Sequence, residues 1–98
     1  MRLEQISYFL SVAKHGNITA AARSLYISQP ALSKQITLLE QEIGLPLFER
    51  QARGVTLTRA GMQFQKDLKN ILKELENAKK NAVLAGRAQK PLLNIGCF

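Results

Sequence analysis

The chain has 98 residues, 46% of them hydrophobic, and a formal net charge of +7. This length suits one small domain with an appendage, and the apolar content excludes general disorder. One cysteine and one histidine exclude an intramolecular disulfide and a zinc site built from several such ligands. The basic balance favours a polyanionic partner, although ribosomal and membrane-surface proteins share it.

The N-terminus lacks the features of a targeting segment. Met1 and Arg2 are followed by Leu3, Glu4 and Gln5 rather than by an apolar run, so we expect no signal peptide. No stretch approaches the roughly 20 apolar residues of a membrane span. We therefore expect a cytoplasmic protein that does not enter a membrane.

The first helix is predicted over residues 3–14. Ile6, Phe9, Leu10 and Ala13 recur at the spacing of one helical face. This pattern indicates an amphipathic helix that packs on a core. A glycine follows the helix and ends it.

Residues 18–44 organise the rest of the chain, because they read as two helices joined by a sharp turn. Asn17 is a good N-cap for the shorter of these two helices, which begins with a run of alanines. Small side chains there allow another helix to approach closely. Tyr26 and Ile27 form the turn that leads to the second helix.

The longer of these two helices, between Ser28 and Gly44, has one apolar and one polar side. Ser28 is its predicted N-cap, Pro30 falls in the first turn where a missing N–H costs little, and Gly44 ends it. The apolar stripe consists of Leu32, Ile36, Leu39 and Ile43. The opposite side carries hydrogen-bonding groups and no carboxylate: Gln29, Ser33, Lys34 and Thr37.

A short helix, a tight turn and a second helix with a polar N-terminal half are typical of a helix-turn-helix. In such a motif the second helix enters the DNA major groove. The alternative is an ordinary pair of antiparallel helices, which any helical bundle contains.

A two-stranded hairpin is predicted after the second helix, from residues 47–50 and 55–58. β-branched and aromatic residues mark both segments, and a turn ending in glycine separates them. Arg50 and Arg53 should lie near its tip, where arginine can contact the DNA backbone or the minor groove. The alternative is that both arginines are solvated turn charges.

A long helix is predicted over residues 59–88, with Thr58 as its N-cap. Its apolar residues recur in steps of four and three, which is the seam of a coiled coil. The seam consists of Phe64, Leu68, Ile71, Leu75, Ala78, Ala82 and Ala85. Residues 1–58 cannot cover the whole seam, so we expect it to form a dimer. The alternative is a lone helix whose first half packs on the preceding domain.

The last segment, residues 91–98, resembles a strand that is cut off at its end. We expect it to begin a further domain. The sequence therefore predicts a DNA-binding domain at 1–58, a dimerisation helix at 59–90 and the start of another domain at 91–98.

Several motifs together resemble the N-terminal domain of LysR-type transcriptional regulators. They are Phe9-Leu10-Ser11-Val12-Ala13, Gly16-Asn17-Ile18-Thr19-Ala20-Ala21-Ala22, Leu25, Ser28-Gln29-Pro30-Ala31-Leu32-Ser33, Gln35-Ile36, Leu39-Glu40, Leu47-Phe48-Glu49-Arg50, Arg53-Gly54 and Leu57-Thr58-Arg59-Ala60-Gly61. They occur in order, at the spacing that is usual in that family, over essentially the whole chain.

The resemblance implies a mainly α protein, a winged helix-turn-helix followed by a dimerising linker helix, from a bacterial transcription regulator. It also implies a separate effector-binding domain of periplasmic-binding-protein type, so we expect no cofactor in these residues. Members of the family commonly form tetramers. They include activators and repressors, so the sign of regulation stays open.

The expected partner is double-stranded DNA, bound by a homodimer. Ser28 should dock the helix on a phosphate through free N–H groups, while Gln29, Pro30, Ser33, Lys34 and Thr37 face the major groove and Arg50 and Arg53 anchor the wing. One rival is a dimeric helical module whose polar face binds protein. An enzyme is disfavoured, because no nucleophile–base pair, metal cluster or glycine-rich phosphate loop is visible.

Overall fold

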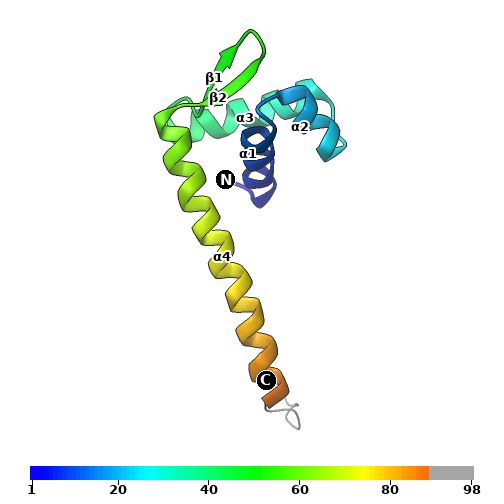
Figure 1. Cartoon of the computed structure of the whole chain (residues 1–98), viewed down its shortest axis with the longest axis vertical. Helices are drawn as coiled ribbons and strands as arrows, with labels where there is room; N and C mark the ends of the chain where they lie inside the picture. Colours follow the sequence, from blue (N-terminus) through cyan, green and yellow to red (C-terminus); the bar gives the residue numbers. More distant parts are fainter. Residues whose placement is uncertain (89–98) are drawn as a thin grey trace. The chain divides into compact units, whose positions relative to one another are not determined.

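The computed structural model describes residues 1–88, which form four helices and a two-stranded antiparallel sheet (Figure 1). The helices are α1 (Leu3–His15), α2 (Ile18–Leu25), α3 (Gln29–Ile43) and α4 (Arg59–Ala88), and the strands are β1 (Phe48–Gln51) and β2 (Gly54–Leu57). The mainly helical winged helix-turn-helix with a long last helix is confirmed. The chain divides into two compact units, Met1–Leu68 and a second that begins at Lys69. We call the first unit the head.

Local signals set the ends of the first two helices. Gly16 adopts φ 66° after α1, a left-handed conformation that glycine takes without strain. The Asn17 side chain then caps α2 by accepting a hydrogen bond from the Ala20 N–H at 2.9 Å. Both residues act as the sequence indicates.

The turn between α2 and α3 is built around Tyr26 in a left-handed conformation, φ 60°. The N–H of Tyr26 donates to the Arg23 carbonyl and the N–H of Ile27 donates to the Ala22 carbonyl. This is the Schellman arrangement, in which glycine is the usual left-handed residue. The Tyr26 side chain is 94% exposed, so packing does not compensate for the backbone strain.

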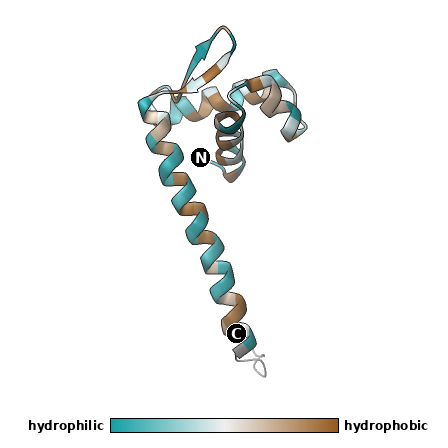
Figure 2. Ribbon diagram, in the orientation of Figure 1, coloured by the Kyte–Doolittle hydropathy of each residue, from teal (hydrophilic) through white to brown (hydrophobic). Residues whose placement is uncertain are grey.

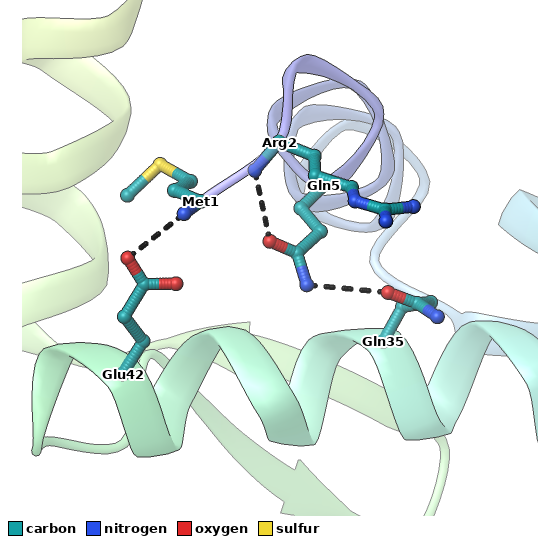
Figure 3. A network of polar contacts seen from close by, with 5 residues as sticks. All are labelled: Met1, Arg2, Gln5, Gln35 and Glu42. Carbon is teal, nitrogen blue, oxygen red and sulfur yellow. Dashed lines mark hydrogen bonds and ion pairs between the residues drawn. The ribbon is translucent and has the colours of Figure 1, made fainter.

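Polar contacts fix the start of α1 against α3 within the head (Figure 3). The N-terminal ammonium of Met1 donates to Glu42 Oε2 at 3.0 Å. Gln5 accepts from the Arg2 N–H at 3.1 Å and donates through Nε2 to Gln35 Oε1 at 3.2 Å. Because exposed ion pairs contribute little to stability, these contacts mainly orient α1.

Each strand of the β1–β2 hairpin is shifted by one residue from its predicted range. β1 begins and ends one residue later, and β2 begins and ends one residue earlier. Gln51 pairs with Gly54 and Phe48 pairs with Leu57, so the turn contains two residues. Thr58 leaves the sheet because its side chain caps the next helix. The Glu40 carboxylate holds the base of the hairpin, accepting from the Leu47 N–H at 2.7 Å and the Phe48 N–H at 3.1 Å.

Phe9 lies at the centre of the core. Its ring centroid is 5.2 Å from that of Phe48 and 5.0 Å from that of Phe64, so α1, the hairpin and α4 meet there. Such ring pairs add to the stabilisation that burial alone provides. The buried residues are Phe9, Val12, Ile18, Ala21, Ala22, Leu32, Ile36, Leu39, Leu47, Phe48, Val55 and Leu68.

The first part of α4 belongs to the head. Thr58 Oγ1 accepts from the Gly61 N–H at 3.0 Å and donates to the Pro46 carbonyl at 2.7 Å. A Cβ on Gly61 would lie 2.1 Å from the Leu47 carbonyl oxygen, so the close approach of α4 requires glycine. Leu68 is 3% exposed. The head therefore extends to Leu68 rather than ending at residue 58.

The rest of α4, from Lys69 to Ala88, belongs to the second unit. Every side chain from residue 69 to residue 87 is exposed, and Figure 2 shows hydrophobic bands crossing a mainly hydrophilic ribbon. Within residues 1–88 no helix combines the length and the apolar character needed to cross a membrane. The strand expected at 91–98 lies outside the described residues.

Candidate nucleic-acid interface

The outward face of α3 is formed by the predicted recognition residues. Gln29, Pro30, Lys34 and Thr37 are exposed, and Ser33 is half-buried. The opposite face of α3 carries Leu32, Ile36 and Leu39, which are all buried. Core packing therefore fixes the rotation of α3 about its axis, and its polar side faces solvent.

The start of α3 has fewer free donors than the sequence suggests. Ser28 is the N-cap, and its Oγ accepts from the Ala31 N–H at 3.2 Å. The Leu32 N–H donates to the Ser28 carbonyl, and Pro30 has no N–H. Within residues 1–88, the Gln29 N–H is thus the backbone donor of the first turn left for a ligand. This narrows the expected phosphate contact to one amide.

Two hydroxyl groups on α3 are already engaged. Thr37 Oγ1 donates to the Ser33 carbonyl at 3.0 Å, one turn earlier on the helix. Ser33 Oγ accepts from Arg50 Nη2 at 3.2 Å. The free hydrogen-bonding capacity of these side chains is therefore smaller than their residue types imply.

The two wing arginines both come close to the turn of the hairpin, but their side chains have different surroundings. Arg53 is in the turn and exposed. Arg50 pairs with Val55 in the ladder and reaches the recognition helix through Ser33. The side chain of Arg50 is long enough to reach from β1 to α3. The spacing of residues along the sequence does not predict this contact.

The hairpin is held against the turn between α1 and α2. The Val55 N–H donates to the Gly16 carbonyl at 3.0 Å. Gly54 has φ 151°, and a Cβ there would lie 2.3 Å from the Gly16 carbonyl oxygen. Glycine is therefore required at this contact, and the wing is positioned by the head.

A shallow pocket of about 170 Å³ lies between α2, α3 and the wing. Its polar side chains include Thr19, Gln29, Arg50 and Gln51, and no carboxylate of residues 1–88 lines it. The sequence does not predict Thr19 or Gln51 as site residues. Both are exposed polar residues, and their positions become significant only when the chain folds around them.

The cations of this surface are not neutralised by the head. Lys34, Arg50 and Arg53 form no ion pair within residues 1–88. No group of three or more metal-ligating side chains is present in the same range. The surface thus combines hydrogen-bonding side chains with unpaired positive charge, as a polyanion site requires.

The predicted seam divides between two environments. Phe64 and Leu68 pack into the core of the head. This differs from the expectation that both residues contact a partner helix. Ile71 and Leu75 are 56% and 48% exposed. The alanines of the seam, Ala78, Ala82 and Ala85, are exposed as well.

Comparison with known proteins identifies the family. The sequence profile of the bacterial regulatory helix-turn-helix proteins, lysR family, matches residues 3–62. The chain belongs to this family. Its relative ClcR from Pseudomonas putida, an HTH-type transcriptional regulator, is 44% identical over 98 residues, which is 100% of this chain and 33% of ClcR. The chain thus spans about a third of the length of that LysR-family relative.

Solved structures of the LysR family share the fold. The crystal structure of the CbnR_DBD-DNA complex has a TM-score of 0.80 and 38% identity, covering 88% of this chain and 99% of that one. The BenM_DBD/catB site 1 DNA complex has a TM-score of 0.79 and 34% identity, covering 89% and 96%. Both relatives were crystallised with DNA.

Proposed function

We propose that this chain is a sequence-specific DNA-binding domain of a bacterial LysR-type transcription regulator. The N-terminal half of α3 enters the major groove, and the β1–β2 wing contacts the backbone or the minor groove. The observation that carries this proposal is the continuous surface of α3 and the wing, which presents amides, hydroxyls and unpaired cations. The DNA complexes of CbnR and BenM support it by analogy.

Some side chains of this surface would contact bases and provide specificity, and others would contact phosphates and position the protein on the duplex. Gln29 can form two hydrogen bonds with adenine, Pro30 can contact a thymine methyl, and Lys34 can reach guanine or a phosphate. The start of α3 at Ser28 favours an anion through its dipole and the Gln29 N–H. Arg53, at the tip of the wing, would neutralise a phosphate or enter the minor groove.

We further propose that the chain binds as a homodimer through the exposed part of α4. Ile71 and Leu75 would begin the seam, with Ala78, Ala82 and Ala85 following where small side chains let two helices approach closely. Phe64 and Leu68 would act indirectly, by fixing the start of α4 in the head. Tetramers would require parts of the protein beyond residues 1–90.

The proposal includes three further expectations, which concern catalysis, cellular location and cofactors. The chain has no catalytic role, it binds DNA in the bacterial cytoplasm, and it needs no cofactor for that binding. Control by a small effector would reside in residues outside 1–90. The relatives are transcriptional regulators, which is consistent with all three.

The test compares Gln29→Ala with Arg53→Ala on cognate and scrambled duplexes at several salt concentrations. Gln29→Ala should weaken cognate binding by about 1–3 kcal/mol and leave scrambled DNA unaffected, because it removes a base contact. Arg53→Ala should weaken both duplexes alike and reduce the log–log salt slope by about one. Fluorescence anisotropy measures both effects, with circular dichroism as the control for folding.

Two results would count against the proposal. A salt slope near zero for the unmodified chain would exclude a phosphate-binding surface. Equal losses on cognate and scrambled DNA for Gln29→Ala would remove base readout from α3. If Arg53→Ala were sequence-selective, its role would move to reading the shape of the minor groove.

A further inference from the structure

The hydrogen bond between Arg50 and Ser33 links the wing to the recognition helix in a way that the proposed function does not use. Arg50 Nη2 lies 3.2 Å from Ser33 Oγ, and the two residues come from β1 and α3. A guanidinium has five N–H donors and no acceptor. The direction of this hydrogen bond is therefore fixed, with Ser33 Oγ as the acceptor.

A serine hydroxyl has one proton, and that proton cannot point toward Arg50. A serine within a helix can instead donate to the carbonyl one turn earlier, here that of Gln29. No such bond is formed, and within residues 1–88 the Ser33 hydroxyl donates to no protein acceptor. The proton is therefore left for whatever approaches the polar side of α3.

Thr37, one turn further along the same face, has the opposite polarity. Its hydroxyl proton is engaged by the Ser33 carbonyl at 3.0 Å, so its oxygen is left with lone pairs. Thr37 can accept a hydrogen bond but has no proton to donate while that bond lasts. The two hydroxyls thus differ because of their surroundings rather than their chemistry.

We propose that Arg50 biases the polarity of base readout, because its bond occupies one of the two lone pairs of Ser33 Oγ and leaves the hydroxyl proton free to donate. Ser33 then favours a base edge that offers an acceptor in the major groove, such as purine N7, guanine O6 or thymine O4. The amino group of cytosine is disfavoured, because it could use only the one remaining lone pair of Ser33 Oγ. Arg50 is a positioning residue in this scheme, and Ser33 contacts the base. The inference rests on the proposed insertion of α3 into the major groove.

The charge of Arg50 also strengthens this donor. A hydroxyl that accepts from a cation is polarised and donates better, and the effect grows when DNA excludes water from the contact. Arg53 provides the matched comparison, because it has the same charge on the same hairpin but lies in the turn. Loss of Arg53 should reduce affinity without altering what Ser33 reads.

The experiment uses the whole 98-residue chain and the tightest duplex that it selects from a randomised library. Single base analogues then delete one group at a time: 7-deazapurines for N7, 2-aminopurine for guanine O6, and 2-pyrimidinone for the cytosine amino group. At one position, deleting an acceptor should weaken binding by about 3- to 10-fold, as expected for one hydrogen bond. Ser33→Ala should abolish that analogue effect at that position.

The Arg50→Leu variant tests the positioning role. It should shrink the same analogue effect to less than about 2-fold, because the hydroxyl loses the cation that polarises it and is free to turn its proton to the Gln29 carbonyl. Arg53→Leu should keep the full effect while lowering affinity for every duplex. Circular dichroism of each variant confirms that the head remains folded.

Three outcomes would overturn the inference alone. In the first, the position that responds to Ser33→Ala is sensitive to loss of a base donor instead of an acceptor. In the second, Arg50→Leu leaves the analogue effect unchanged, and in the third no position responds to Ser33→Ala. Failure of the chain to select any sequence is a different result, because it would overturn the proposed function and the inference with it.

Discussion

The two parts of α4 have the same apolar periodicity and different surroundings. In the head, Leu68 is 3% exposed and Phe64 packs against Phe9 with ring centroids 5.0 Å apart. Farther along the same helix, Ile71 and Leu75 are 56% and 48% exposed. The steps of four and three continue through both parts without a break. The pattern therefore indicates which face is apolar, but it does not say what covers that face.

This difference assigns separate roles to the two parts. Residues buried in the head contribute to its stability, whereas residues exposed on α4 are available for association. One continuous apolar seam can thus be buried within the head in its first part and be exposed in its second. Substitutions in the two parts should change different measured quantities, and that expectation leads to the following predictions.

The largest effect is expected for Ile71→Glu combined with Leu75→Glu. Burying unpaired carboxylates in a dimer is costly, so self-association should weaken at least ~100-fold while the head stays folded. Sedimentation velocity measures the association, and circular dichroism follows the fold. The control is Asn70→Glu with Asn77→Glu, which adds the same charge away from the seam. A double variant that stays dimeric would remove the seam from the interface.

A smaller effect is expected for Leu68→Ala, introduced into the Ile71→Glu/Leu75→Glu chain so that no partner contributes. The free energy of unfolding should fall by about 3 kcal/mol, because a buried leucine leaves a cavity. Urea unfolding followed by tyrosine fluorescence reports on the head, where both tyrosines lie. Leu84→Ala, at a position 62% exposed, should change this value by less than about 0.5 kcal/mol. Equal effects would mean that the two parts of α4 are not distinct.

The smallest effect concerns the glycines of α4. Gly61→Ala should lower the free energy of unfolding by about 2 kcal/mol, because its Cβ would meet the Leu47 carbonyl oxygen and the backbone must shift. A Cβ on Gly86 would meet no atom of residues 1–88 within 4 Å, so Gly86→Ala should cause no loss of stability and a slight gain in helicity. Thermal unfolding of both variants by circular dichroism makes the comparison. A neutral Gly61→Ala would show that the start of α4 is not tightly docked.

The elements of the fold followed closely from the sequence, because their ends depend on neighbouring residues. Asn17, Ser28 and Thr58 cap helices through their own side chains, and Gly16 and Gly44 end helices in left-handed conformations. Each of these signals acts over three or four residues. A left-handed tyrosine at position 26 was not predicted, since that conformation is usual for glycine.

The sequence predicted the residues on the polar side of α3, but it did not predict the hydrogen bond that joins α3 to the wing. The polar side of α3 is where the apolar stripe requires it to be, since core packing fixes the opposite side. The bond from Arg50 to Ser33 joins residues 17 positions apart, and no local spacing encodes it. The same holds for Glu40, whose carboxylate holds the base of the hairpin.

The sequence by itself determined the helices, their caps, the polar side of α3, the hairpin and the resemblance to LysR-type regulators. These features depend on residue type and on periodicity, which are local properties of the chain. Tertiary structure decided which residues of the α4 seam are buried in the head, where Arg50 reaches, and why Gly54 and Gly61 must be glycine. Such contacts join distant segments at van der Waals or hydrogen-bond distance, and only the folded chain brings those atoms together.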